Sequence, residues 1–104
     1  MTSKMRNIPT EVDGIRFHSK KEASRYKDLK LLETAGEIEN LRLQVPYILI
    51  PKQKGERECK YYADFVYEQD GQTIVEDAKG ARMKEYIIKR KLMLFIHGIK
   101  VKET

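Results

Sequence analysis

Apolar residues recur with helical spacing in two parts of the chain. The first part begins at Ser19, where Ser19-Lys20-Lys21-Glu22 fits the capping box S-x-x-E, and Gly36 is well placed to end it. The second part precedes Gly98, a residue that commonly ends helices. The stripe that we expect this second helix to bury consists of Met83, Ile87, Ile88, Leu92, Phe95 and Ile96.

Strand signals fill most of the remaining chain. Residues 38–50 alternate apolar and polar side chains, which is the period of a half-buried strand. Two further strands, at residues 60–69 and 72–78, flank Asp70-Gly71, a dipeptide that favours a tight hairpin turn. Asp13-Gly14 predicts a small hairpin within residues 11–18, and the apolar residues at 99–101 predict a short last strand. The order of elements is typical of an α/β (α+β) domain with a mixed central sheet.

The size and charge of the chain narrow this picture. A length of 104 residues allows one domain, so we expect residues 1–18 to form an N-terminal segment with the hairpin and residues 19–104 to form a single domain. Lys and Arg number 21 against 16 Asp and Glu, and this excess favours an anionic partner. Because the chain shows neither a signal peptide nor an apolar run of membrane-spanning length, we expect a cytoplasmic protein that binds no membrane.

The predicted hairpin at Asp70-Gly71 places two aspartates face to face. If those two residues form the turn, Gln69 lies opposite Gln72, and counting back places Asp64 opposite Asp77. Lys79 then emerges on the same face of the sheet, and Glu76 on the other face. Two opposed carboxylates repel each other, and Mg²⁺ offsets such repulsion well because it prefers oxygen ligands.

A divalent cation beside a lysine suits phosphodiester hydrolysis. The cation polarises the phosphate and lowers the pKa of a bound water, while Lys79 orients the nucleophile or stabilises the developing charge. His18 and His97 lie in different elements without a third ligand at zinc spacing, and the chain has no glycine-rich phosphate loop. We therefore expect neither a zinc site nor a nucleotide cofactor.

These residues resemble a known family signature. Asp64 in YYADFVY, followed by Asp77-Ala78-Lys79 in IVEDAKG, is similar to the motif of the PD-(D/E)xK nucleases, and Glu22 in SKKEASRY stands where a helical glutamate often completes their metal site. The resemblance covers roughly residues 19–102 and extends to small phage and prophage proteins of domain of unknown function 1064. It implies a restriction-endonuclease-like core of αβββαβ order, with Glu22, Asp64 and Asp77 as catalytic metal-site residues and Lys79 as the catalytic lysine.

Three of the polar residues have an ordinary alternative explanation. Glu22 closes the capping box, so its carboxylate could bond back to the start of the helix instead of a metal ion. Gln44 lies between apolar residues of a strand, and it is either a polar neighbour of the metal site or an ordinary exposed position. Lys79 could likewise pair with one of the aspartates.

Basic residues on both helices suggest a surface for nucleic acid. As a solvated helix face they need no further explanation, and as a phosphate-binding surface beside the acids they fit DNA. The residues that we expect to contact nucleic acid are Lys20, Lys21, Arg25, Arg82, Tyr86 and Lys89.

Three functions are compatible with the sequence. The first, implied by the resemblance, is a Mg²⁺-dependent DNA endonuclease, with Mn²⁺ as a substitute, encoded by a phage or prophage. It would act in the bacterial cytosol on branched DNA during recombination, as a homodimer. The second is a nuclease-like module without activity that binds DNA or a replication or recombination partner. The third is an RNA nuclease, since the metal chemistry acts on the phosphate and not on the sugar.

Overall fold

The protein is described by a computed structural model over residues 9–78 and 83–104. It has a mixed α+β architecture with two helices, and the order of elements matches the prediction. The elements are β1 (Thr10–Val12), β2 (Ile15–Phe17), α1 (Lys20–Thr34), β3 (Glu39–Ile50), β4 (Cys59–Gln69), β5 (Gln72–Asp77), α2 (Lys84–His97) and β6 (Lys102–Glu103). Strands β3, β4, β5 and β6 form one sheet in that order, with β6 parallel to β5 and the other neighbours antiparallel.

Both predicted hairpin turns are confirmed. Asp70 and Gly71 take left-handed φ angles of 52° and 78°, and Gln69 pairs with Gln72 across the turn. Asp13-Gly14 joins β1 to β2 in the same way, with φ angles of 55° and 76°. The right-handed twist of the strands favours such turns, and glycine takes the second position at no steric cost.

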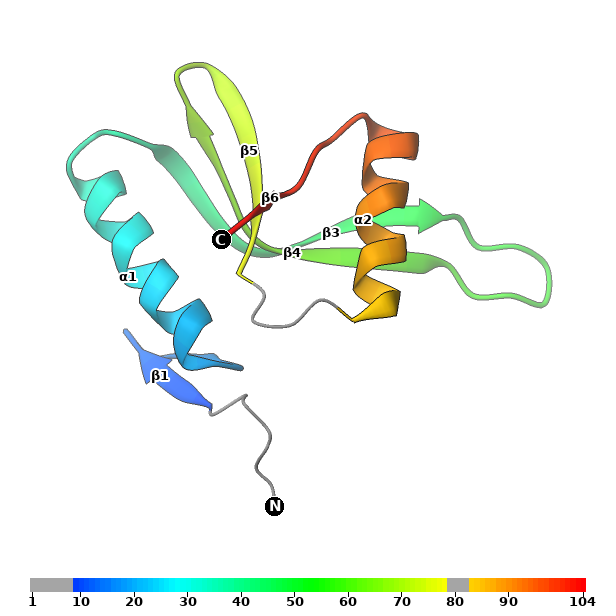
Figure 1. Cartoon of the computed structure of the whole chain (residues 1–104), viewed down its shortest axis with the longest axis horizontal. Coiled ribbons are helices and arrows are strands. Elements are labelled where there is room, and N and C mark those ends of the chain that lie inside the picture. The colour runs from blue at the N-terminus through cyan, green and yellow to red at the C-terminus, as the bar shows by residue number, and fades with distance from the viewer. Residues whose placement is uncertain (1–8, 79–82) are drawn as a thin grey trace.

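Helix α1 begins and ends as predicted. The hydroxyl of Ser19 accepts a hydrogen bond from the amide of Glu22, and Gly36 follows the helix with a φ of 82°. Ala23, Tyr26 and Leu29 are buried on one face of the helix. That face packs on the sheet and on the β1–β2 hairpin, which lies beside the first turn of α1 (Figure 1).

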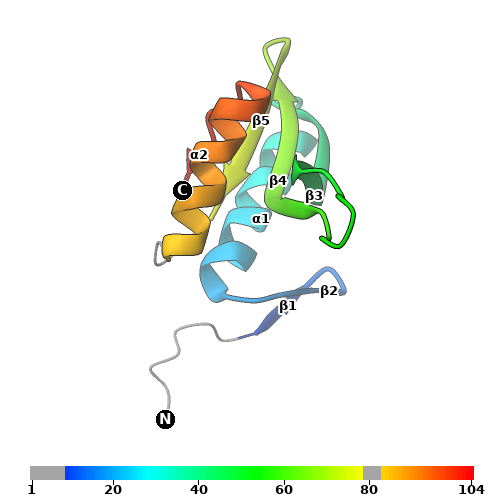
Figure 2. The same cartoon turned by 90° about the vertical axis from the view of Figure 1, so that its right-hand side faces the viewer.

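The two helices lie over different parts of the sheet (Figures 1 and 2). Each helix contributes to its own hydrophobic cluster. The cluster under α1 consists of Phe17, Ala23, Tyr26, Leu29, Ile38, Phe65, Tyr67 and Ala78. The cluster under α2 consists of Leu49, Tyr61, Ala63, Val66, Val75, Tyr86, Met93 and Val101.

The long β3–β4 ribbon passes from one cluster to the other. In β4, Phe65 packs in the α1 cluster, whereas Ala63, two residues earlier and on the same side of a regular strand, packs in the α2 cluster. In β3, Leu43 and Val45 divide between the two clusters in the same way. The surface of the ribbon that packs in the α1 cluster at Leu43 and Phe65 therefore packs in the α2 cluster at Val45 and Ala63. The change occurs at the level of Gln44.

The buried face of α2 differs from the predicted stripe. Met93 is fully buried and Tyr86 is 7% exposed, whereas Phe95 is 86% and Ile88 58% exposed. Met83 and Ile96 are also exposed, and Ile87 and Leu92 are partly buried. The stripe was wrong at Met83, Ile88, Phe95 and Ile96 and left out both buried residues, because Tyr86 and Met93, seven positions apart, set the face of the helix that packs on the sheet. Strand β6 likewise begins at Lys102, after the apolar residues predicted to form it.

Candidate active site

Three polar residues from separate elements meet where the ribbon turns. Gln44 of β3 donates from Nε2 to Oε2 of Glu22 at 3.1 Å and to Oδ1 of Asp64 at 3.0 Å. Glu22 comes from the first turn of α1, and Asp64 comes from the middle of β4. Both acids are almost buried, at 5% and 7% exposure, while Gln44 is exposed above them. One side-chain amide thus joins two buried carboxylates close to the surface.

The backbone of Gln44 is unusual for a strand residue. Its φ of 51° is left-handed, although Leu43 and Val45 on either side pair regularly with Phe65 and Ala63. A non-glycine residue in this region costs about 1–2 kcal/mol. Such strain in a regular strand is characteristic of functional sites. Here it coincides with the turn of the ribbon and with the bonds to both acids.

Glu22 serves the helix start and the site together. Oε1 accepts from the amide of His18 at 3.2 Å, while Oε2 accepts from Gln44. The reciprocal bond of the predicted capping box thus goes to His18 and not to Ser19. Burial raises the pKa of Glu22 above its ordinary value, and the nearby charge of Asp64 raises it further.

Asp77 and Asp64 have different hydrogen-bond partners. Asp77 is fully buried, and Tyr61 of the α2 cluster donates its hydroxyl to Oδ2 of Asp77. Asp64 instead accepts at Oδ2 from the amide of Ala78 at 3.0 Å. The register that pairs Phe65 with Glu76 is the one predicted, but the two aspartates find different partners. Lys79 and Arg82 lie outside the described residues.

The donor atoms of the site suit a hard cation. Mg²⁺ is held by one or two carboxylates together with waters, and Glu22 and Asp64 supply two carboxylates that converge on one amide N–H₂ group. Within residues 9–78 and 83–104, no group of three His, Cys, Asp or Glu side chains lies close enough together to hold a metal ion. Glu22 and Asp64 therefore fit such an ion as a pair.

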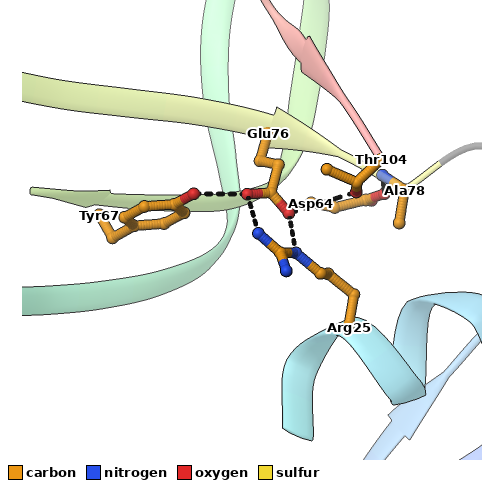
Figure 3. A network of polar contacts seen from close by, with 6 residues as sticks. All are labelled: Arg25, Asp64, Tyr67, Glu76, Ala78 and Thr104. Carbon is orange, nitrogen blue, oxygen red and sulfur yellow. Dashed lines mark hydrogen bonds and ion pairs between the residues drawn. The ribbon is translucent and has the colours of Figure 1, made fainter. Parts of the chain in front are cut away.

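The sequence did not predict the main charged pair of the fold. Glu76 is fully buried and receives two hydrogen bonds from Arg25 of α1, at 2.5 Å and 3.0 Å, as Figure 3 shows. Tyr67 donates to the same carboxylate at 2.5 Å and Thr104 at 3.2 Å. Burial alone would raise the pKa of Glu76, but the bonds from Arg25 and Tyr67 hold it below its ordinary value. The sequence predicts only that Glu76 emerges on the face opposite Asp64, and it gives no sign of the pairing with Arg25.

Several residues predicted to contact nucleic acid have internal roles. Arg25 is bound to Glu76, so its guanidinium faces the sheet. Tyr86 is buried and donates its hydroxyl to Glu103 at 2.7 Å. Lys89 forms an ion pair with Glu85 at 3.3 Å. The predicted basic stripe of α2 is therefore not a free surface at Tyr86, whereas Lys20 and Lys21 are exposed in the first turn of α1.

A recess opens beside the site. It has a volume of about 140 Å³ and is lined by Ile15, Arg16, Phe17, His18, Glu22, Leu43 and Gln44. A larger recess of about 230 Å³ lies along α1 and is lined by Lys21, Ser24, Arg25, Asp28 and Thr104. Because the smaller recess is lined by Glu22 and Gln44, it is the one that gives access to the carboxylate of Glu22.

Comparison with known proteins places the chain in a family. No curated protein and no solved structure matches it. Among the described residues, neither helix is long and apolar enough to cross a membrane. A family model described as "Protein of unknown function (DUF1064)" matches residues 2–102, which is nearly the whole chain. The chain therefore belongs to the DUF1064 family.

Proposed function

We propose that this protein is a Mg²⁺-dependent endonuclease of the PD-(D/E)xK type, with a restriction-endonuclease-like core, that hydrolyses phosphodiester bonds of DNA. The observation that carries the proposal is the convergence of Glu22 and Asp64 on Gln44 at the strained turn of the ribbon. Two buried carboxylates that bind the same amide group are stable together only with a proton, a hydrogen-bond donor or a cation between them. Gln44 supplies such a donor.

The residues of the chain have distinct tasks in this proposal. Glu22 and Asp64 would hold the cation, and Asp77 is kept in one orientation by the hydroxyl of Tyr61. When bound, the cation would polarise the phosphate and lower the pKa of a water. Lys79 follows Asp77 by two positions and would supply the positive charge beside the phosphate. Gln44 orients the two carboxylates by donating to both.

The biological setting of the proposal follows from the sequence resemblance. We infer a phage or prophage protein of the bacterial cytosol that acts on branched DNA during recombination. The net charge of +5 supports a nucleic-acid substrate. A domain of this size covers little of a junction, so a homodimer would present two sites to two strands.

Cleavage of plasmid and four-way-junction DNA with Mg²⁺, Mn²⁺ or EDTA tests the proposal. We expect metal-dependent cleavage, and we expect Asp64→Asn, Asp77→Asn and Lys79→Ala each to lower the rate by at least about 100-fold. Glu39→Gln, an exposed acid of β3, is the matched control and should cleave normally. An RNA competitor in the same reaction distinguishes a ribonuclease. Absence of cleavage with every divalent ion would refute the proposal.

A second candidate is a nuclease-like module that binds DNA or a replication partner without cleaving. The position of Asp77 favours it, because its carboxylate binds Tyr61 and does not join Glu22 and Asp64 in a three-acid group among the described residues. DNA binding that persists in EDTA, without cleavage in any metal, would support this alternative over the enzyme.

A further inference from the structure

The recess beside Gln44 has walls of two chemical kinds. Ile15, Phe17 and Leu43 supply apolar side chains, and Arg16 and His18 supply basic ones. Its volume of about 140 Å³ is several times the roughly 30 Å³ that one water occupies in the liquid, so it has room for a phosphodiester group. Glu22 and Gln44 belong to the same lining, so a group bound there would lie next to the acids.

The basic residues next to this recess do not stabilise the start of helix α1. Lys20 and Lys21 occupy the first turn of α1, where the helix dipole favours acidic residues and disfavours lysine by about 0.3–1 kcal/mol each. Both are exposed, as are Arg16 and His18 on the adjoining strand. Arg16 and His18 thus line the recess beside Glu22, and Lys20 and Lys21 follow them directly in the chain. These basic side chains would attract a polyanionic ligand to the recess.

We propose that the β1–β2 hairpin carries the nucleic-acid contact of the site, and that the recess binds a backbone phosphate next to the bond to be cleaved. Arg16 contacts this phosphate, and His18 lines the recess beside it. The inference rests on the proposed nuclease function, but it concerns binding and not the chemical step. It assigns a substrate role to a hairpin that otherwise only packs against α1.

Binding of a fluorescent four-way junction and of a duplex, measured by anisotropy in EDTA, tests the inference without turnover. Arg16→Ala should weaken binding about tenfold, the effect of losing one charged hydrogen bond. It should also reduce the slope of log K against log salt by about 0.9, the effect of one lost phosphate contact. Arg57→Ala is the matched control, because it removes the same charge from an exposed position in the loop between β3 and β4.

A second variant tests the recess apart from its charge. Leu43→Trp fills the recess from β3 and leaves Arg16 in place, so it should also weaken binding, provided that its thermal melt shows a folded protein. Equal binding by the Arg16 and Arg57 variants would overturn the inference. So would normal binding by a folded Leu43→Trp protein. If the wild type binds through Arg16 but never cleaves, the proposed function fails and the hairpin contact stands.

Discussion

Gln44 has a strained backbone and also makes the polar contacts that join the candidate site. Its left-handed backbone turns the β3–β4 ribbon, and its amide bridges acids from α1 and β4. Ordinary strand positions favour alanine over glycine by about 0.5–1 kcal/mol. A left-handed position reverses that preference, because glycine has no Cβ to clash.

This reversal gives a prediction for stability. We expect Gln44→Gly to be more stable than Gln44→Ala by about 1 kcal/mol, since both variants lose the same amide and differ in backbone strain. At Tyr62, a regular and half-exposed position of β4, the order should be the opposite. Urea unfolding of the four variants measures both differences. If alanine is the more stable residue at both positions, Gln44 is not left-handed in solution.

Glu22 makes stability depend on pH in an unusual direction. Its pKa in the folded protein is raised, so the folded state holds the proton more tightly than the unfolded chain. The contribution of Glu22 is therefore fully present below the unfolded pKa of about 4.5 and is lost as the pH rises through the folded pKa. Wild type should lose stability relative to Glu22→Gln between pH 4 and pH 8, as measured by urea unfolding.

The same titration predicts how Mg²⁺ acts. A cation between Glu22 and Asp64 replaces the proton, so Mg²⁺ should raise the melting temperature at pH 8 and have little effect at pH 4. Glu22→Gln should abolish this shift, and Glu39→Gln should preserve it. A shift of the same size in both variants would place the ion elsewhere.

At the scale of elements, helix α2 shows which of its apolar residues stabilise the fold. Met93 is fully buried and Phe95 is 86% exposed, although both lie in the same two turns. Met93→Ala should cost about 2–5 kcal/mol of unfolding free energy, and Phe95→Ala should change it by less than about 0.5 kcal/mol. Urea midpoints of the two variants measure the contrast. Comparable losses of stability in the two variants would show that Phe95 is buried, as the sequence predicts.

The ion pair between α1 and β5 offers a second contrast. Arg25 satisfies a fully buried Glu76, whereas Arg42 meets Glu68 at a more exposed position, at 2.8 Å. Removing one partner of a buried pair costs about 3–5 kcal/mol, and a surface pair contributes at most about 1 kcal/mol. Arg25→Met should therefore destabilise the protein by about 3 kcal/mol and Arg42→Met by less than about 1 kcal/mol, as measured by urea unfolding.

At the scale of the whole molecule, local sequence signals were sufficient for turns and helix ends. Asp70-Gly71 set the register that pairs Phe65 with Glu76, and Ser19 and Gly36 set the limits of α1. These features depend on a few neighbouring residues and on backbone rules.

The remaining features depend on long-range packing. Nothing in the residue type marks Gln44 as left-handed, because glycine, asparagine and aspartate are the usual residues there. Without the turn of the ribbon, a regular strand puts Ala63 and Phe65 in one cluster. The partners of Arg25 and Tyr86 were also hidden, since each lies far away in the sequence.

The turn of the ribbon also divides the acids between two halves of the molecule. Glu22 belongs to the half packed under α1, and Asp77 is tied through Tyr61 to the half packed under α2. Bending at Gln44 would move Tyr61, and with it the aspartate that it binds, relative to α1. Stiffness at this joint is thus expected to govern how often all the acids meet, and amide exchange at Leu43 and Val45 would report its opening.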